Sequence, residues 1–259
     1  MATPILVFDI ETVPDVAGLR KLWELSDEVS DDAVVELVSQ RRRQATGSDF
    51  FPTHLQRIVA ISCVLRAGGE TLRAWSVGGA EDGERELVKR FFEGVDKYVP
   101  TLVSWNGSSF DLPVLHYRAL IHGVQACCYW DLGEDNKEFK WNNYISRWHL
   151  RHTDLMDVLA GYQNRAWAPL NEIAVLCGLP GKLGMDGSQV WPAYKRGEIE
   201  AIRNYCETDV ANTYLLYLRF QHMRGALSPE SYEREVALFR TFLAEQAAPH
   251  WKEFSDAWK

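Results

Sequence analysis

Acidic residues interrupt or directly follow apolar runs at three separated places in this chain of 259 residues. Asp9 and Glu11 lie in LVFDIET, Asp111 follows VSWNGSSF, and Asp209 lies in NYCETDVANTY, where Tyr205 comes one helical turn earlier. A cluster of buried carboxylates is costly unless a positive charge neutralises it. The chain must therefore fold so that these acids are solvated separately or share a cation.

The apolar patterns predict a mixed sheet flanked by helices. We expect strands at 5–10, 57–66, 70–77 and 101–105, with a hairpin at the Ala-Gly-Gly turn 67–69. Helical periodicity predicts helices over 81–98, 112–122, 155–162, 170–177, 198–224 and 228–245. This order of elements favours an α/β fold around a partly antiparallel sheet.

Length and composition favour one large domain over residues 1–259. The segment at about 15–53 is predicted to be an insertion, and about 225–259 a helical, aromatic C-terminal extension. With 46% hydrophobic residues the chain can bury a substantial core, and no run of eighteen apolar residues predicts a membrane span. The aromatic residues Trp251, Phe254 and Trp258 are expected to pack on the domain or on a neighbouring subunit.

Charge and cysteine content limit the class of protein further. The formal net charge of −8 argues against a basic surface that coats nucleic acid without regard to sequence. The five cysteines show no CxxC spacing, and the N-terminus lacks the charged region of a signal peptide. A reduced, cytoplasmic protein is expected, in which the neighbouring Cys127 and Cys128 are two small buried residues.

The acidic residues suit divalent metal ions. Side chains two apart on a strand share a face, so Asp9 and Glu11 can bind one ion together. Mg²⁺ and Mn²⁺ prefer oxygen ligands, and a pair of such ions about 3.5–4 Å apart is typical of phosphoryl transfer. Asp9 could bridge both ions, Glu11 and Asp209 could complete the first, and Asp111 could hold the second.

Tyr205 lies on the same helical face as Asp209, four residues away. A tyrosine with an ordinary pKa of about 10 is a poor general base at neutral pH. We therefore expect its hydroxyl to orient the attacking water by hydrogen bonding.

The same residues carry a resemblance to a known family. DIET at 9–12, NGSSFD at 106–111 and YCETD at 205–209 resemble the three motifs of DEDD-type 3′-5′ exonucleases of the ribonuclease H-like superfamily. The tyrosine at 205 is typical of the DEDDy subclass, and WNGSSFDLPVL is most similar to the proofreading exonuclease of family B DNA polymerases. GLPGKLGMDGSQV at 178–190 and YCETDVANTYLLYLRF at 205–220 resemble a bacterial family of stand-alone exonucleases related to that domain.

The resemblance implies a ribonuclease H-like sheet with three antiparallel strands plus parallel strands. It also implies removal of nucleotides from the 3′ end of single-stranded or frayed nucleic acid, with release of 5′-monophosphates. DNA is favoured over RNA as the substrate. Thr12 and Asn106 would lie beside the terminal nucleotide, and Phe110 would lie near its base or be buried behind Asp111. An exoribonuclease, and a non-catalytic nucleic-acid binding module, are the alternative functions.

Several signals also have purely structural interpretations. Asp111 alone would suit a helix N-cap, and Asp154 is expected to cap the helix after it. The basic run 41–43 is expected to be a solvated helix face, although it could touch a phosphate backbone. Lys182, in the glycine-rich GKLGMDG, is expected to lie near the substrate. Trp141, Tyr144 and Trp148 could stack on bases or pack in the core.

Overall fold

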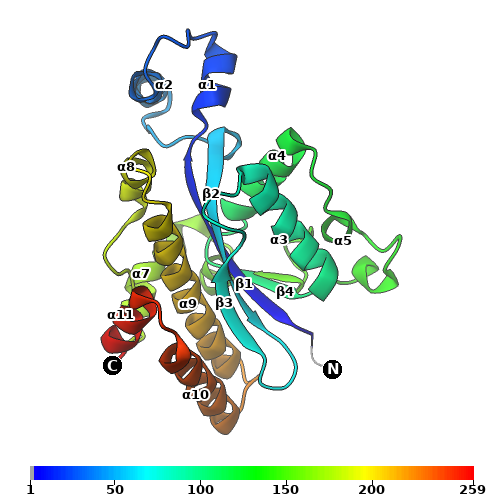
Figure 1. Ribbon diagram of the computed structural model, residues 1–259. Coiled ribbons are helices and arrows are strands. Elements are labelled where there is room, and N and C mark those ends of the chain that lie inside the picture. The colour runs from blue at the N-terminus through cyan, green and yellow to red at the C-terminus, as the bar shows by residue number, and fades with distance from the viewer. Residues whose placement is uncertain (1–2) are drawn as a thin grey trace.

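A five-stranded mixed sheet forms the centre of the computed structural model, which describes residues 3–259 (Figure 1). The strand order is β3-β2-β1-β4-β5, with bounds β1 Ile5–Pro14, β2 Gln56–Arg66, β3 Leu72–Ser76, β4 Thr101–Ser104 and β5 His152–Asp154. The pairs β1–β2 and β2–β3 are antiparallel, whereas β4 runs parallel to β1 and β5 parallel to β4. The predicted ribonuclease H-like arrangement of three antiparallel strands plus parallel strands is confirmed.

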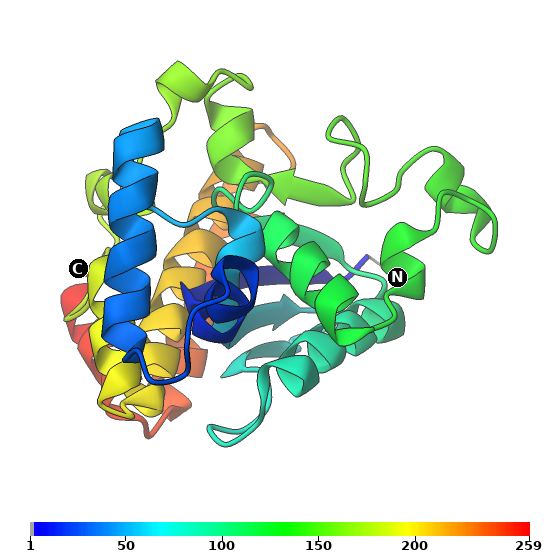
Figure 2. The same cartoon turned by 90° about the horizontal axis from the view of Figure 1, so that it is seen from above.

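Helices cover both faces of this sheet, as the views from the front and from above show (Figures 1 and 2). One face carries α3 Glu84–Tyr98, α4 Asp111–His122 and α5 Cys127–Trp130. The other carries α7 Leu170–Leu176, α9 Ile199–Met223, α10 Pro229–Glu245 and α11 Pro249–Ala257. Shorter elements are α6 Leu155–Leu159, α8 Val190–Lys195 and 3₁₀ turns at Thr53–Leu55, Lys137–Lys140, Asn164–Ala166 and Gly187–Gln189.

The central strand β1 is buried on both faces, which explains its nearly continuous apolar sequence. Leu6, Phe8 and Ile10 pack toward α3 and α4, whereas Val7 packs toward α9. Because successive strand side chains alternate, Asp9 shares the face of Val7 and points toward α9. The apolar pattern that builds the core therefore also places acidic side chains beneath the longest helix.

The segment at 15–53 forms two helices, α1 Val16–Trp23 and α2 Asp31–Thr46, which lie beyond the ends of β1 and β2 (Figure 1). They have a small core of their own, made of Leu19, Val34, Val38, Phe51 and Leu55. An ion pair of 2.6 Å between Asp32 Oδ1 and Lys195 Nζ connects α2 to α8. In the basic run 41–43, Arg41 and Arg43 are exposed, in agreement with the solvated face that was expected, whereas Arg42 is half-buried and donates to the carbonyl of Phe50.

The C-terminal helices pack on α9 as the aromatic tail predicted. Trp251, Phe254 and Trp258 are buried in the cluster that α9 and α10 share. Glu207 of α9 accepts a hydrogen bond of 2.7 Å from Ser76 Oγ, and its other oxygen lies 2.8 Å from His250 Nε2 of α11. The extension is therefore joined directly to the helix that carries Tyr205 and Asp209.

Three details differ from the predictions. Strand β5 was not expected, the helix predicted over 155–162 ends at Leu159, and Cys127 is exposed and Cys128 half-buried, whereas both were expected to be buried. Successive side chains of a helix point about 100° apart, and in α5 it is Tyr129 that faces the core. None of the helices described between residues 3 and 259 is both long and apolar enough to cross a membrane.

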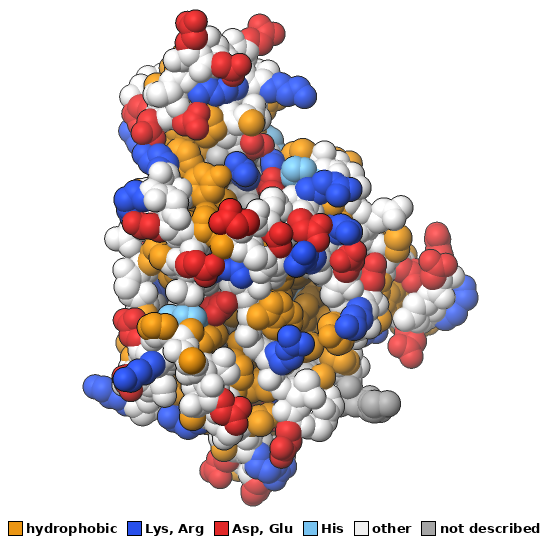
Figure 3. All heavy atoms as spheres, in the orientation of Figure 1, with side chains coloured by type: hydrophobic (Ala, Val, Ile, Leu, Met, Phe, Trp, Pro, Cys, Tyr) orange, Lys and Arg blue, Asp and Glu red, His pale blue; other side chains and the backbone are white. Residues whose placement is uncertain are grey.

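The surface seen in Figure 3 carries acidic and basic side chains interspersed, without one continuous basic area. This distribution agrees with the net charge of −8. On this face, nonspecific binding of nucleic acid through a broad positive surface is not favoured.

Candidate active site

The fold brings the four predicted carboxylates and Tyr205 to one place. Asp9 and Glu11 come from the centre of the sheet, while Asp111 is the first residue of α4, after the neighbouring strand β4. On α9, Tyr205 and Asp209 are one turn apart and both buried. Three segments more than 90 residues apart in sequence thus meet between β1 and α9.

Contacts between these segments fix the arrangement. The carboxylate Oδ1 of Asp111 accepts a hydrogen bond of 3.2 Å from the backbone N–H of Ile10, between the two acids of β1. Because this carboxylate binds β1, it does not cap its own helix, and the N-cap position is Phe110. The thiol of Cys206 donates to Asp9 Oδ2 across 3.6 Å and so connects α9 to β1. The alternative interpretation of Asp111 as a simple helix cap is therefore wrong.

The cluster carries more negative charge than the protein neutralises. Burial, followed by the charges of Asp111, Glu11 and Asp209, raises the pKa of Asp9 well above its usual range. Burial and the charge of Asp209 do the same to the pKa of Glu11. Burial raises the pKa of Asp111 to about 7 and that of Asp209 to about 6. At neutral pH these pKa values leave Asp9, Glu11 and part of Asp111 protonated unless a cation joins them, whereas Asp209 is largely ionised.

One lysine approaches the cluster. Lys182 Nζ lies 3.9 Å from Asp209 Oδ2 and is the one basic group within ion-pair distance of the four acids in residues 3–259. The loop that presents it turns at Gly181, whose φ is +69° and whose missing Cβ would lie 2.6 Å from Asn171 Oδ1. Asn212 of α9 holds the same glycine through both its backbone groups, at 3.2 and 2.9 Å. Lys182 therefore lies beside the acidic cluster, and its expected position near the substrate stays a prediction.

The donor set fits divalent cations. One ligand atom each from Asp9, Glu11 and Cys206 lies within 4.8 Å of the others, a spacing suitable for a shared ion. Asp209 Oδ1 is buried and accepts no hydrogen bond from any described residue, so this oxygen is free to bind a metal ion. Carboxylate oxygens dominate, as Mg²⁺ and Mn²⁺ require. The residues present therefore fit a metal site, whereas the single amine of Lys182 cannot balance four carboxylates.

Tyr205 is placed to form hydrogen bonds rather than to accept a proton. Lys182 Nζ donates to its hydroxyl across 2.5 Å, and the ammonium lies over the tyrosine ring, 5.2 Å from its centroid. Burial, then the charges of Asp209, Glu11 and Asp9, raises the pKa of this phenol far above 10. The hydroxyl therefore keeps its proton at neutral pH and can orient a water molecule, but it cannot act as a base.

The three residues predicted to contact the terminal nucleotide surround this cluster in sequence. Thr12 lies at a β-bulge of β1, where its hydroxyl donates to Gln56 Oε1 at 3.0 Å. Asn106 has a φ of +69°, and its Oδ1 is buried without a hydrogen-bond partner among the described residues. Phe110 packs against Phe50 of the insertion, with ring centroids 5.8 Å apart. The unused acceptor of Asn106 is available to a ligand, whereas Thr12 and Phe110 already have partners.

Asp154 caps α6, as predicted, and also holds the second motif. Its carboxylate accepts from the backbone N–H groups of Met156 and Asp157, at 3.1 and 3.3 Å. It accepts two more, from Asn106 at 2.9 Å and Ser108 at 2.8 Å. The loop that ends at Asp111 is therefore fixed by a residue 48 positions away from Asn106, a contact that the sequence did not indicate. The contact of the Cys206 thiol with Asp9 was likewise not predicted from the sequence.

The fold and the site define a class of protein: a ribonuclease H-like domain with an acidic cluster between the central strand and a long helix. A part of the structure of the family B DNA polymerase from the hyperthermophilic archaeon Pyrobaculum calidifontis has a similar fold. The match covers 86% of this chain and 25% of that chain, with a TM-score of 0.50 and 16% sequence identity.

The chain belongs to the family described as "Predicted 3′-5′ exonuclease related to the exonuclease domain of PolB", whose model matches residues 48–258. Membership in this family suggests nuclease activity. Asp111, Tyr205 and Asp209 fall inside the matched range. Asp9 and Glu11 precede it, so their association with the other three depends on the geometry of β1.

Curated relatives include DNA polymerases from distant organisms. The chain is 26% identical over 147 residues to the catalytic chain of DNA polymerase epsilon from Aspergillus fumigatus, and 27% identical over 148 residues to that from Saccharomyces cerevisiae. It is 25% identical over 148 residues to the DNA polymerase of Archaeoglobus fulgidus. These matches include 55–56% of this chain but only 6% of each epsilon polymerase chain and 18% of the archaeal polymerase.

Proposed function

We propose that this protein is a metal-dependent 3′-5′ exonuclease that hydrolyses phosphodiester bonds at the 3′ end of single-stranded or frayed DNA. The products are nucleoside 5′-monophosphates. The observation that carries this proposal is the set of four carboxylates that converge without enough positive charge to neutralise them. The family and the polymerase relatives support a phosphodiester of nucleic acid as the substrate.

In this mechanism Asp9, Glu11, Asp111 and Asp209 hold two divalent ions, Mg²⁺ or Mn²⁺. When bound, such ions supply a hydroxide at neutral pH and stabilise the charge that develops around the phosphorus. Tyr205 keeps its proton and orients the attacking water through its hydroxyl. Buried carboxylates that are fixed by β1, α4 and α9 hold this arrangement before the substrate binds.

Lys182 assists from the edge of the site. Its ammonium fixes the Tyr205 hydroxyl and partly offsets the charge of Asp209. We assign Thr12, Asn106 and Phe110 to the terminal nucleotide. The unpaired Oδ1 of Asn106 can accept a hydrogen bond from it, and the Phe110 ring offers a surface on which a base can stack.

The replacement Asp9→Asn tests the catalytic assignment. It removes one charge from the cluster without changing its shape, and we expect turnover to fall by about 10²- to 10³-fold, as for loss of one group that stabilises transition-state charge. The measurement is the shortening of 5′-labelled DNA with Mg²⁺ or Mn²⁺. A matched control is Glu200→Gln on α9, whose side chain is 71% exposed and outside the cluster.

The same assay separates the alternative functions. Matched DNA and RNA strands show whether a 2′-hydroxyl is tolerated, because that group is what distinguishes the two at a given site. Equal activity of the Asp9→Asn and wild-type proteins would contradict the assigned site. Binding of nucleic acid with no turnover under either cation would identify a non-catalytic binding module instead.

A further inference from the structure

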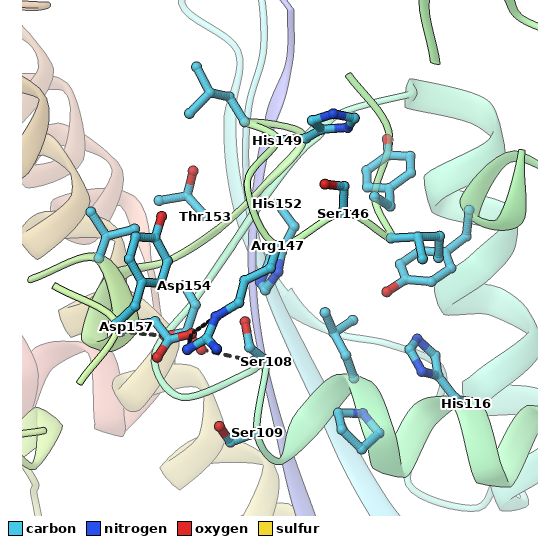
Figure 4. Close-up of a pocket in the computed structure, with 18 of the residues that line it drawn as sticks. Ser108, Ser109, His116, Ser146, Arg147, His149, His152, Thr153, Asp154 and Asp157 are labelled. Carbon is cyan, nitrogen blue, oxygen red and sulfur yellow. Dashed lines mark hydrogen bonds and ion pairs between the residues drawn. The ribbon is translucent and has the colours of Figure 1, made fainter. Parts of the chain in front are cut away.

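A second cavity lies beside the loop that joins β4 to α4. It encloses about 580 Å³, and none of the five acidic-site residues lines it (Figure 4). Ser108 and Ser109 form one wall, so the cavity and the acidic cluster share the loop 106–110. Its other walls come from α4, α5, β5, α6, the segment 144–150 and the end of α9. A volume of this size is typical of sites for small organic ligands.

Aromatic side chains from several segments surround this space. The rings belong to Tyr129, Trp130, Tyr144, Tyr162, Trp167 and Phe220. Tyr144 is a core residue, because its ring stacks on Tyr129 and its hydroxyl donates to the carbonyl of Pro100. Trp130 is half exposed and so presents a free ring surface. Such rings bind nucleobases by stacking with little regard to base identity.

His116 adds a polar group that the protein does not use. Its Nε2 is buried and has no hydrogen-bond partner among residues 3–259, although the ring packs against Tyr129 and Trp130. Burial lowers the pKa of His116 to about 4, so the imidazole is neutral at physiological pH. A neutral imidazole nitrogen can donate to or accept from the edge of a heterocycle, depending on its tautomer.

Two arginines and two acids line the cavity, and their pairing decides whether an anion can bind there. Arg147 donates to Asp157 Oδ2 through Nε and Nη2, at 3.1 and 2.7 Å, and this pair lies in the centre of Figure 4. The other acid of the wall, Asp154, has its oxygens occupied by four backbone N–H groups. Arg224 is exposed and forms no ion pair within the part of the chain that the structure describes. The two arginines only balance the charges of Asp154 and Asp157, so a phosphate is attracted by the exposed Arg224 and by the N–H groups of Arg147 that Asp157 leaves free, and it meets no unpaired carboxylate oxygen.

From these features we propose that the cavity binds one nucleotide, with its base among the rings and its phosphate toward Arg147 and Arg224. Two sources share this chemistry. One is a nucleotide of the substrate strand upstream of the 3′ terminus, and this source rests on the proposed exonuclease function. The other is a free nucleoside 5′-monophosphate. In both cases the ligand touches the Ser108–Ser109 loop that leads to Asp111.

Binding in the presence of a chelator tests this proposal without requiring turnover. The probes are 5′-labelled single-stranded DNA of increasing length, followed by fluorescence anisotropy, and dAMP alone, followed by calorimetry. Trp130→Ala removes a stacking surface, and His116→Phe keeps a ring of similar size without its nitrogens. Trp141→Ala is the matched control, since this tryptophan of the neighbouring segment is 76% exposed and does not line the cavity.

We expect Trp130→Ala to weaken binding by about 5- to 100-fold, the effect of losing one base–aromatic stack. His116→Phe should weaken it by about 2- to 10-fold, the effect of losing one hydrogen bond, while Trp141→Ala leaves it unchanged. If the replacements weaken binding of the longer strands but not of dAMP, the ligand is the upstream nucleotide of the strand. Weaker binding of dAMP identifies the free nucleotide. If neither probe responds to either replacement in proteins whose thermal melting is intact, the nucleotide pocket is overturned.

The two proposals fail separately. If the wild-type protein binds the probes as predicted but degrades no strand with Mg²⁺ or Mn²⁺, the proposed exonuclease function is wrong and the proposed nucleotide pocket stands. If the protein degrades DNA but its binding of the probes is unchanged by Trp130→Ala and His116→Phe, the proposed nucleotide pocket is wrong and the proposed exonuclease function stands.

Discussion

Two sites with buried carboxylates in this protein differ in whether the chain supplies partners for their negative charge. Between α3 and α4, Glu84 Oε1 accepts from Arg118 Nε at 2.7 Å and from the backbone N–H of Ile58 at 2.6 Å. Its Oε2 accepts from Arg118 Nη2 and lies 2.7 Å from His122 Nε2. Arg118 reaches in addition to Asp15 at 2.6 Å and thereby joins the insertion to α4. Every charged oxygen of Glu84 has a partner within the chain.

The acidic cluster below α9 lacks such partners. Asp9, Glu11, Asp111 and Asp209 face one another, and Lys182 alone approaches them, at 3.9 Å from Asp209, among the residues that the structure describes. The first group is complete and connects parts of the fold. The second is incomplete, and an incomplete buried polar group in a native protein indicates a missing partner such as an ion. Both kinds of acid are buried. What distinguishes the structural acids from the proposed functional ones is whether the chain supplies hydrogen-bond and ion-pair partners for their oxygens.

Arg118→Met breaks the complete group and is expected to have the largest effect on stability. Methionine keeps an apolar chain in place of the arginine stem but leaves Glu84 without its main counter-charge. Removal of one partner of a buried ion pair costs about 3–5 kcal/mol of unfolding free energy. Urea denaturation measures this loss, and the protein that remains folded should keep the activity proposed for the acidic site.

The exposed pair of Arg196 and Glu198 supplies the control. Arg196→Met removes a charge of the same type where water replaces the partner, so no measurable change in stability is expected. If the replacements of Arg118 and Arg196 had equal effects, the buried network around Glu84 would contribute nothing to stability, and the contrast between the two groups would disappear.

Asp209→Asn should act in the opposite direction on the metal-free protein. At neutral pH the pKa of about 6, against an ordinary value of 3.8, means that burying ionised Asp209 destabilises the fold by about 3 kcal/mol. The amide removes this cost of burying a charge, so metal-free stability should rise by about that amount, while the stabilisation by Mg²⁺ should be lost. Thermal melting with a chelator and with Mg²⁺ measures both. Loss of stability in the chelator would contradict the claim that the cluster is short of positive charge.

Much of this contrast was accessible from sequence because it depends on local periodicity. The two-residue spacing of Asp9 and Glu11 on a strand and the four-residue spacing of Tyr205 and Asp209 on a helix each place a pair on one face. Asp111 follows a strand directly. The strands at 57–66 and 101–105 and the helix at 198–224 were predicted nearly at their observed bounds for the same reason: each has a long or distinct apolar pattern.

The missing parts depend on contacts between distant residues. Strand β5 has the sequence His-Thr-Asp, which lacks an apolar alternation and becomes a strand only by pairing with β4. Glu84 is a helix residue like any other until Arg118, 34 positions later, lies against it. Neither could be predicted from sequence, because periodicity indicates only the faces of single elements, whereas the partner across the core decides whether a charge is neutralised.

The effect of pH on stability provides the finest test of the comparison. Raised pKa values, about 7 for Asp111 and about 6 for Asp209, mean that the folded metal-free protein retains protons that the unfolded chain has already released. This contribution to stability is present at low pH and is lost as the pH rises through the folded pKa values. His116 and His152 have pKa values lowered to about 4, which gives the opposite slope below about pH 6.5. The unfolding free energies with and without Mg²⁺ are therefore compared above that pH.

Between about pH 6.5 and pH 8 the metal-free protein should lose stability, by up to about 1.4 kcal/mol per pH unit for each proton released. Mg²⁺ binds the ionised carboxylates, so its stabilising effect should grow over the same interval. Asp111→Asn removes the group that titrates near pH 7 and should flatten the metal-free slope. Denaturation at the two pH values with and without Mg²⁺ measures these differences. A stabilisation by Mg²⁺ that is equal at both values would mean that the cluster is already fully ionised without metal, and that the protein neutralises it as completely as it does Glu84.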